Sequence, residues 1–95
     1  MDIVIQSFKD KRAEQLFNDE PVVELANIQK QARTRLIRLH LAASLSDLRV
    51  FPGNRLEALR GNRKGQYSIR INDQYRICFQ WEEKGPTNVE IVDYH

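Results

Sequence analysis

The period of the hydrophobic positions changes near the middle of the chain. In the first half, apolar residues recur every three or four positions, which predicts an amphipathic helix after Pro21. Its apolar positions are Leu25, Ile28, Ala32, Leu36, Leu39 and Ala43. A shorter helix is predicted at about residues 9–18, capped by Ser7 or Asp10. The β-branched start at residues 2–6 suits a first strand, so the first half is expected to form a strand followed by two helices.

From Asp47 onward the segments are short, aromatic or β-branched, and turn residues divide them. The predicted strands are residues 55–59, 66–71, 74–82 and 88–94. Asn72 and Asp73 lie between two apolar runs, which predicts a tight hairpin. Residues 44–54 are interpreted as a connection between the helices and the sheet.

The third of these strands has two unlike faces, because successive side chains of a strand point to opposite sides. The face that we expect in the core consists of Tyr75, Ile77, Phe79 and Trp81. The other face carries Arg76, Cys78 and Gln80. The order of elements predicts an α+β fold, with the helices on one face of a small, mainly antiparallel sheet and the other face open to a ligand.

Composition limits the class of protein. The chain has 95 residues, 41% hydrophobic and 29% charged, which suits one domain over residues 1–95. Cys78 is the single cysteine, so no internal disulfide is expected, and no Cys/His spacing predicts a metal site or a cofactor. No run approaches the roughly 18 apolar residues that span a bilayer. The start lacks the features of a signal peptide, and we expect a cytoplasmic protein without a membrane partner.

The charges are unevenly distributed although the net charge is only +2. Residues 49–84 contain eight basic residues against four acidic ones. This half of the chain is therefore suited to a polyanion.

Several segments in fixed order resemble the HigB branch of the RelE-like toxins. They are Asp47-Leu48, Pro52-Gly53-Asn54-Arg55-Leu56, Leu59-Arg60-Gly61, Gly65-Gln66-Tyr67-Ser68-Ile69, Tyr75-Arg76-Ile77-Cys78-Phe79 and Val92-Asp93-Tyr94-His95. The resemblance implies a RelE-like fold and the toxin of a type II toxin–antitoxin system, which cuts messenger RNA on the translating ribosome without a cofactor. It also implies a cognate antitoxin, which is commonly a helix-turn-helix protein. The toxin would then associate with operator DNA only through this antitoxin.

The same resemblance places a catalytic site on the basic face of the sheet. The implied catalytic residues are His95, Arg76, Asp93 and Tyr94. These types fit metal-independent RNA cleavage, because histidine transfers protons near neutrality, arginine holds charge on phosphate, and a carboxylate orients the imidazole. The residues expected to bind the RNA backbone are Arg55, Arg60, Arg63 and Lys64.

The chain departs from its relatives at one point. They often have His-Pro-Leu-Lys-Gly where this chain has Glu57-Ala58-Leu59-Arg60-Gly61. Arg60 keeps the positive charge of the lysine. Glu57 would repel RNA unless it is paired with an arginine or acts as a base.

Other interpretations stay open at this point. Arg76 could form a structural salt bridge with Asp93 or Glu90, and Tyr94 could stack on RNA or simply close the sheet. Taken alone, a terminal histidine such as His95 is usually an exposed chain end. For the whole chain, the alternatives are a non-catalytic relative that only binds its antitoxin or nucleic acid, and a toxin of the same fold that poisons DNA gyrase.

Overall fold

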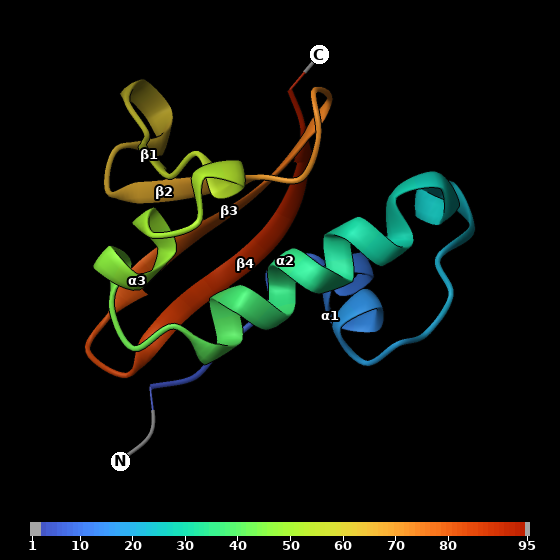
Figure 1. Cartoon of the computed structure of the whole chain (residues 1–95), viewed down its shortest axis with the longest axis horizontal. Helices are drawn as coiled ribbons and strands as arrows, with labels where there is room; N and C mark the ends of the chain where they lie inside the picture. The colour runs from blue at the N-terminus through green and yellow to red at the C-terminus, as the bar shows by residue number, and fades with distance from the viewer. Residues whose placement is uncertain (1–2, 95) are drawn as a thin grey trace.

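The computed structural model describes residues 3–94, which form a layer of helices packed on one sheet (Figure 1). The helices in chain order are α1 (Lys11–Phe17), η1 (Val23–Ile28), α2 (Gln29–Leu41), α3 (Leu45–Arg49), η2 (Pro52–Asn54) and η3 (Gly61–Arg63). The strands are β1 (Glu57–Ala58), β2 (Gln66–Arg70), β3 (Tyr75–Glu82) and β4 (Gly85–Asp93). They form an antiparallel sheet in the order β1-β2-β3-β4, which confirms the predicted α+β fold.

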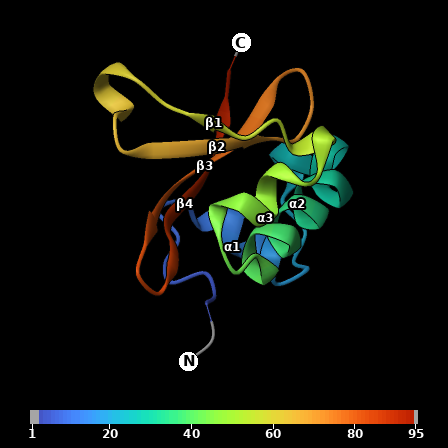
Figure 2. The same cartoon turned by 60° about the vertical axis from the view of Figure 1, so that its left-hand side comes forward.

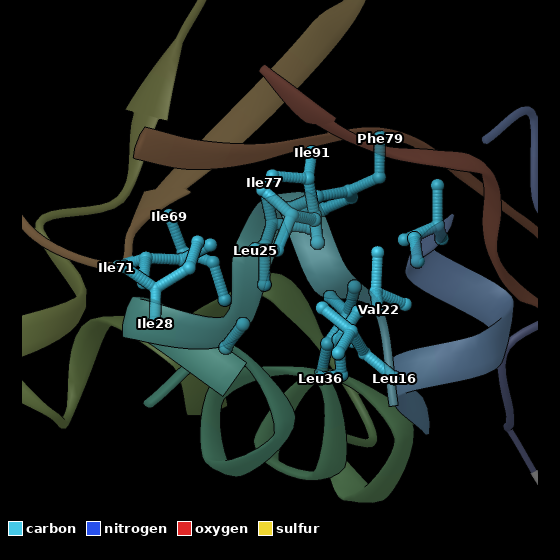
Figure 3. Packing of buried hydrophobic residues seen from close by; sticks show 14 of the residues in the cluster. Leu16, Val22, Leu25, Ile28, Leu36, Ile69, Ile71, Ile77, Phe79 and Ile91 are labelled. Carbon is cyan, nitrogen blue, oxygen red and sulfur yellow. The ribbon is translucent and has the colours of Figure 1, made fainter. Parts of the chain in front are cut away.

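The helices α1 and α2 cover one face of the sheet (Figures 1 and 2). The core fills the space between the layers, where Leu16 and Leu36 of the helices meet Ile77 and Phe79 of β3 (Figure 3). These four side chains are fully buried, and each such burial contributes about 1.5–3 kcal/mol. The predicted core face of β3 is confirmed, since Tyr75 and Trp81 are partly buried against the same cluster as Ile77 and Phe79.

The first helix is tied to the sheet through its N-cap. Of the two predicted caps it is Asp10 that caps α1, because its carboxylate accepts a hydrogen bond from the backbone N–H of Arg12 (3.0 Å). The same carboxylate accepts the backbone N–H of Ile91 in β4 (3.1 Å). Ser7 instead uses its hydroxyl to accept the backbone N–H of Asn88 (2.9 Å).

The predicted first strand, residues 2–6, is wrong as a strand. Residue 2 lies outside the described part of the chain, and the residues after it run beside β4 without a regular ladder. The N–H of Val4 donates to the carbonyl of Lys84 (3.2 Å), but Pro86, which would return the bond, has no N–H. The N–H of Gln6 also donates to the carbonyl of Pro86 (2.7 Å), but the β-bridge to β4 comes only after the predicted strand, at Phe8.

The helical region is more broken than the hydrophobic period predicted. Backbone angles at Leu25 (φ −117°, ψ 17°) interrupt the predicted long helix, so that η1 precedes α2, and α2 ends at Leu41. Residues 44–54 were expected to be a connection, but they contain α3 and η2. The hydroxyl of Ser44 caps α3 by accepting the N–H of Asp47 (3.4 Å). A helix of five residues is too short to show a hydrophobic period.

The predicted strands differ from the observed ones mainly at their ends. The strand expected at residues 55–59 is only β1, because Arg55 adopts a left-handed conformation (φ 45°) that ends any extended pairing before it. The last strand begins three residues earlier than expected, and Asn88 (φ 52°) lies in a bulge within it. The hairpin at Asn72 is confirmed, and its side chain accepts the N–H of Tyr75 (2.8 Å).

None of the helices within residues 3–94 has the length and apolar character to cross a membrane.

Candidate nucleic-acid interface

The sheet face turned away from α1 and α2 is polar. Side chains that lie opposite one another on paired antiparallel strands share a face. The register pairs Ser68 with Cys78 and Arg70 with Arg76 across β2 and β3. Together with β4, these strands form the polar face from Gln66, Ser68, Arg70, Arg76, Cys78, Gln80, Glu90, Val92 and Tyr94.

Arg76 is held rigidly on the polar face and is only 8% exposed. Its Nε donates to the hydroxyl of Ser68 (2.7 Å). Its Nη2 donates to the carbonyl of Ser68 (3.4 Å) and to the carbonyl of Arg55. Its Nη1 makes no hydrogen bond within residues 3–94. That nitrogen therefore remains available to a ligand, on a guanidinium whose other nitrogens are fixed by the protein.

The acidic partner of Arg76 is Glu57. The distance from its Oε1 to the Nη1 of Arg76 is 3.9 Å, and its side chain is 58% exposed. Glu90, one of the partners considered from the sequence, binds Lys9 and Arg63 instead of Arg76. Glu57 is thus paired with an arginine, which is one of the two conditions under which it would not repel RNA.

Tyr94 lies beside Arg76 on the polar face. The Arg76 Cζ is 5.8 Å from the centroid of the Tyr94 ring, and Tyr94 is 45% exposed. Burial, and then the neighbouring Cys78, raise the pKa of the Tyr94 phenol above its ordinary value of 10.0. The phenol therefore keeps its proton near neutrality and can act as a hydrogen-bond donor.

Cys78 forms part of the buried floor of this face. It is fully buried, and burial is the main cause that raises the pKa of its thiol. A thiol in this state is a poor nucleophile, so Cys78 acts as a packing residue.

The other two residues of the implied catalytic set are placed differently. His95 lies outside the described residues. Asp93 is paired in register with Tyr75, so it lies on the helix side of the sheet, opposite to Arg76. Its Oδ2 accepts a hydrogen bond from the Nε2 of Gln74 (3.1 Å). Of the implied catalytic residues, the described structure brings together Arg76 and Tyr94.

The four expected RNA-binding residues lie around β1 and η3. Arg63 is engaged, because its Nη1 donates to Glu90 (3.1 Å) and to Gln66 (3.0 Å), and the bond with Glu90 raises the pKa of its guanidinium. Arg60 and Lys64 are exposed at either end of η3. Arg55 has an exposed side chain, while its carbonyl accepts from Arg76.

Sequence reasoning did not identify the acceptors that position Arg76. Ser68 is fully buried and supplies both a hydroxyl and a carbonyl oxygen. The alternation of Gln66, Ser68 and Arg70 in β2 indicated a polar face, but a serine in a strand gives no sign that it binds an arginine. The acceptor at Arg55 is a backbone carbonyl, which has no sequence signal.

Within residues 3–94, no three His, Cys, Asp or Glu side chains are grouped so that they could hold a metal ion.

Comparison with known sequences gives three similarities. Residues 6–95 match the family model described as the RelE-like toxin of type II toxin-antitoxin system HigB. Toxin HigB-1 of Vibrio cholerae is 47% identical over 76 residues, which cover 78% of this chain and 80% of that protein. An uncharacterized protein of Haemophilus influenzae is 33% identical over 64 residues, which cover 67% of this chain and 63% of that protein.

Among solved structures, the YoeB/ParE toxin from Agrobacterium tumefaciens is similar, with a TM-score of 0.49 and 17% identity. That similarity covers 98% of this chain and 94% of the other.

Proposed function

Since this chain belongs to the HigB family of RelE-like toxins of type II toxin–antitoxin systems, we propose that it is an endoribonuclease that cleaves translated mRNA on the ribosome. The observation that carries this proposal is the state of Arg76. Its Nη1 makes no hydrogen bond in residues 3–94 and lies 3.9 Å from Glu57 Oε1, while Ser68 and Arg55 hold the rest of the guanidinium. A guanidinium fixed in this way binds a phosphate without first reorganising.

Cleavage of RNA without a metal requires three tasks. The 2'-hydroxyl loses a proton as its oxygen attacks phosphorus, the phosphoryl oxygens gain charge, and the leaving 5'-oxygen takes up a proton. In this proposal the 2'-hydroxyl gives its proton to solvent water, and Arg76 neutralises the phosphoryl charge through Nη1. His95, which follows from the family resemblance, donates the proton to the leaving oxygen. Asp93, which lies on the helix side of the sheet, would act only through His95, by favouring its protonated form.

Tyr94 supports the same assignment. Its exposed ring lies 5.8 Å from the Arg76 Cζ, and its phenol is protonated near neutrality. A phosphate bound at Arg76 would lie beside this ring, where the hydroxyl can donate to a phosphoryl oxygen or the ring can stack on a base. Arg55, Arg60, Arg63 and Lys64 would guide the RNA backbone toward this point.

Glu57 has a defined part in this proposal. Its carboxylate is 3.9 Å from Nη1 of Arg76, beyond hydrogen-bond distance, and it is more than half exposed. Since Glu57 is solvated and makes no hydrogen bond to the buried Arg76, the pair is worth on the order of 1 kcal/mol. In the empty site the Glu57 carboxylate would balance the charge of Arg76. An incoming phosphate would displace this carboxylate at a small cost in free energy.

Membership of the family implies an antitoxin as the partner of this chain. We propose that the antitoxin is a helix-turn-helix protein of the HigA type and that operator DNA is bound only through it. The remaining proposed partners are the ribosome and its mRNA. This setting places the protein in the cytoplasm.

The proposal is tested by mapping cleavage of one message in a purified translation system. Primer extension is used to compare the native chain with Arg76→Ala and His95→Gln, with one reaction that lacks ribosomes. We expect cuts within the translated region that need the ribosome and that fall by at least about a hundredfold in both variants.

Lys30→Ala is the matched control for loss of a positive charge, because Lys30 is exposed on α2 in the helix layer. Cleavage by Arg76→Ala and His95→Gln at the rate of this control would overturn the assigned site. Binding without cleavage by the native chain would favour a non-catalytic relative. Loss of DNA supercoiling in a gyrase assay would favour the gyrase-poisoning alternative.

A further inference from the structure

A second polar site lies on the same face as Arg76 but some distance from it. It is a pocket of about 320 Å³, lined by Lys9, Gln66, Gln80, Asn88 and Glu90. Gln80 follows Arg76 by four residues in β3, which places the pocket about 13 Å away along the strand. A single RNA strand lying on this face would cover that distance in a few nucleotides.

Hydrogen bonds fix the side-chain amides of the pocket. The Nδ2 of Asn88 donates to the Oε1 of Gln80 (2.6 Å), and the Oε1 of Gln66 accepts from Arg63 (3.0 Å). These bonds occupy one end of each amide. The opposite ends, Nε2 of Gln66, Nε2 of Gln80 and Oδ1 of Asn88, have no protein partner among residues 3–94. Two oriented donors and one oriented acceptor therefore remain available to a ligand.

The charges of the pocket suit an RNA rather than repel it. Glu90 is only 15% exposed and lies between Arg63 (3.1 Å) and Lys9 (3.6 Å). Two cations thus compensate one carboxylate. Lys9 is 61% exposed, so its ammonium group can reach a backbone phosphate and also adds a third donor.

We propose that this pocket binds one base of the RNA, a few nucleotides from the phosphate held by Arg76. This inference rests on the proposed function. The volume is near the low end of the range of about 300–1,000 Å³ for ligand sites, which suits a single base. Because the pocket offers three donors and one acceptor, it should prefer uracil and cytosine, whose Watson–Crick edges present two acceptors and one donor, over guanine and adenine, which present one acceptor there.

The test is to sequence the cleaved ends of an mRNA pool with randomised codons in a ribosome-containing translation system. We expect uracil and cytosine to be enriched at one position, a fixed few nucleotides from the cut. Gln80→Glu replaces the Nε2 donor by an acceptor, and it should lower that enrichment roughly tenfold, in favour of guanine, whose Watson–Crick edge presents two donors. Gln31→Glu, on the exposed surface of α2, makes the same chemical change outside the pocket and should leave the enrichment unchanged.

Thermal unfolding checks that each variant is folded, and Gln80→Met provides a second variant that loses the donor without gaining a charge. Gln80→Met should abolish the enrichment rather than reverse it. If the variants cleave with the same base preference as the native chain, the pocket does not read a base, although the nuclease proposal stands. If the native chain does not cleave at all, the nuclease proposal fails, and the pocket's role fails with it.

Discussion

At the scale of single residues, the proposed chemistry depends on how Ser68 orients Arg76. Ser68→Ala removes the acceptor at 2.7 Å from Nε and leaves that N–H buried without a partner. We expect the free energy of unfolding to fall by about 1–3 kcal/mol, and RNA cleavage to fall more than the folded fraction does. Urea denaturation and the cleavage rate measure the two effects. Ser46→Ala, on the exposed side of α3, is the control. Unchanged cleavage would show that Arg76 does not need Ser68.

Glu57 can be tested at the same scale. Glu57→Gln removes the negative charge 3.9 Å from Nη1 of Arg76 without changing the shape of the side chain. If Glu57 only balances the charge of the empty site, RNA should bind up to about fivefold more tightly. Fluorescence anisotropy with 2'-O-methyl RNA, which cannot be cleaved through the 2'-hydroxyl, measures this binding. Glu24→Gln, exposed in η1, is the control. Weaker binding would contradict the charge-balancing role, and a loss of cleavage with intact binding would indicate a base.

At the scale of elements, Asp10 joins α1 to β4 and should make this junction sensitive to acid. Burial tends to raise the pKa of Asp10, but hydrogen bonds from the Arg12 side chain and from two backbone N–H groups leave it below its ordinary value of 3.8. A lowered pKa contributes stability that is present above the ordinary value and is lost as the pH falls through the folded value.

Asp10→Asn should therefore be less stable than the native chain by about 1 kcal/mol at pH 7, and this difference should shrink below about pH 4. Urea denaturation at several pH values measures it. Asp47→Asn is the control, because Asp47 also accepts a backbone N–H at a helix start, from Ala43, but is exposed and has no hydrogen bond to the sheet within residues 3–94. A difference that does not change with pH would contradict the role of the Asp10 charge.

Elements defined by a pattern over many residues could be predicted from the sequence, whereas features decided by one residue or one contact could not. The hydrophobic period predicted the α2 region and the core face of β3, because burial of a repeated apolar stripe decides both. The first strand failed because Pro86 lacks an N–H, and α3 was missed because five residues carry no period. For the site, Arg76 was identified through its motif, whereas its partners Ser68 and Glu57 come from the strand register.

At the scale of the whole molecule, the net charge of +2 does not show where the positive charges lie on the surface. The connection between β1 and β2, which holds η3, projects away from the helix layer (Figure 2). It carries Arg60 and Lys64, both exposed, at the edge of the polar face. RNA that approaches this edge would meet these two cations before it reaches Arg76, so they should supply affinity without taking part in the chemistry.

This role predicts a change in the salt dependence of binding. Each contact of a cation with a phosphate of single-stranded RNA contributes about 0.7 to the slope of log affinity against log salt concentration. Replacing both Arg60 and Lys64 by glutamine should therefore lower the slope by about 1.4. Fluorescence anisotropy at salt concentrations between about 50 and 200 mM measures the slope. The same double change at Lys11 and Lys30 keeps the net charge matched but lies in the helix layer, where both side chains are exposed. An equal fall in slope for both pairs would mean that RNA is not confined to the polar face, and the placement of the cleavage site there would lose its support.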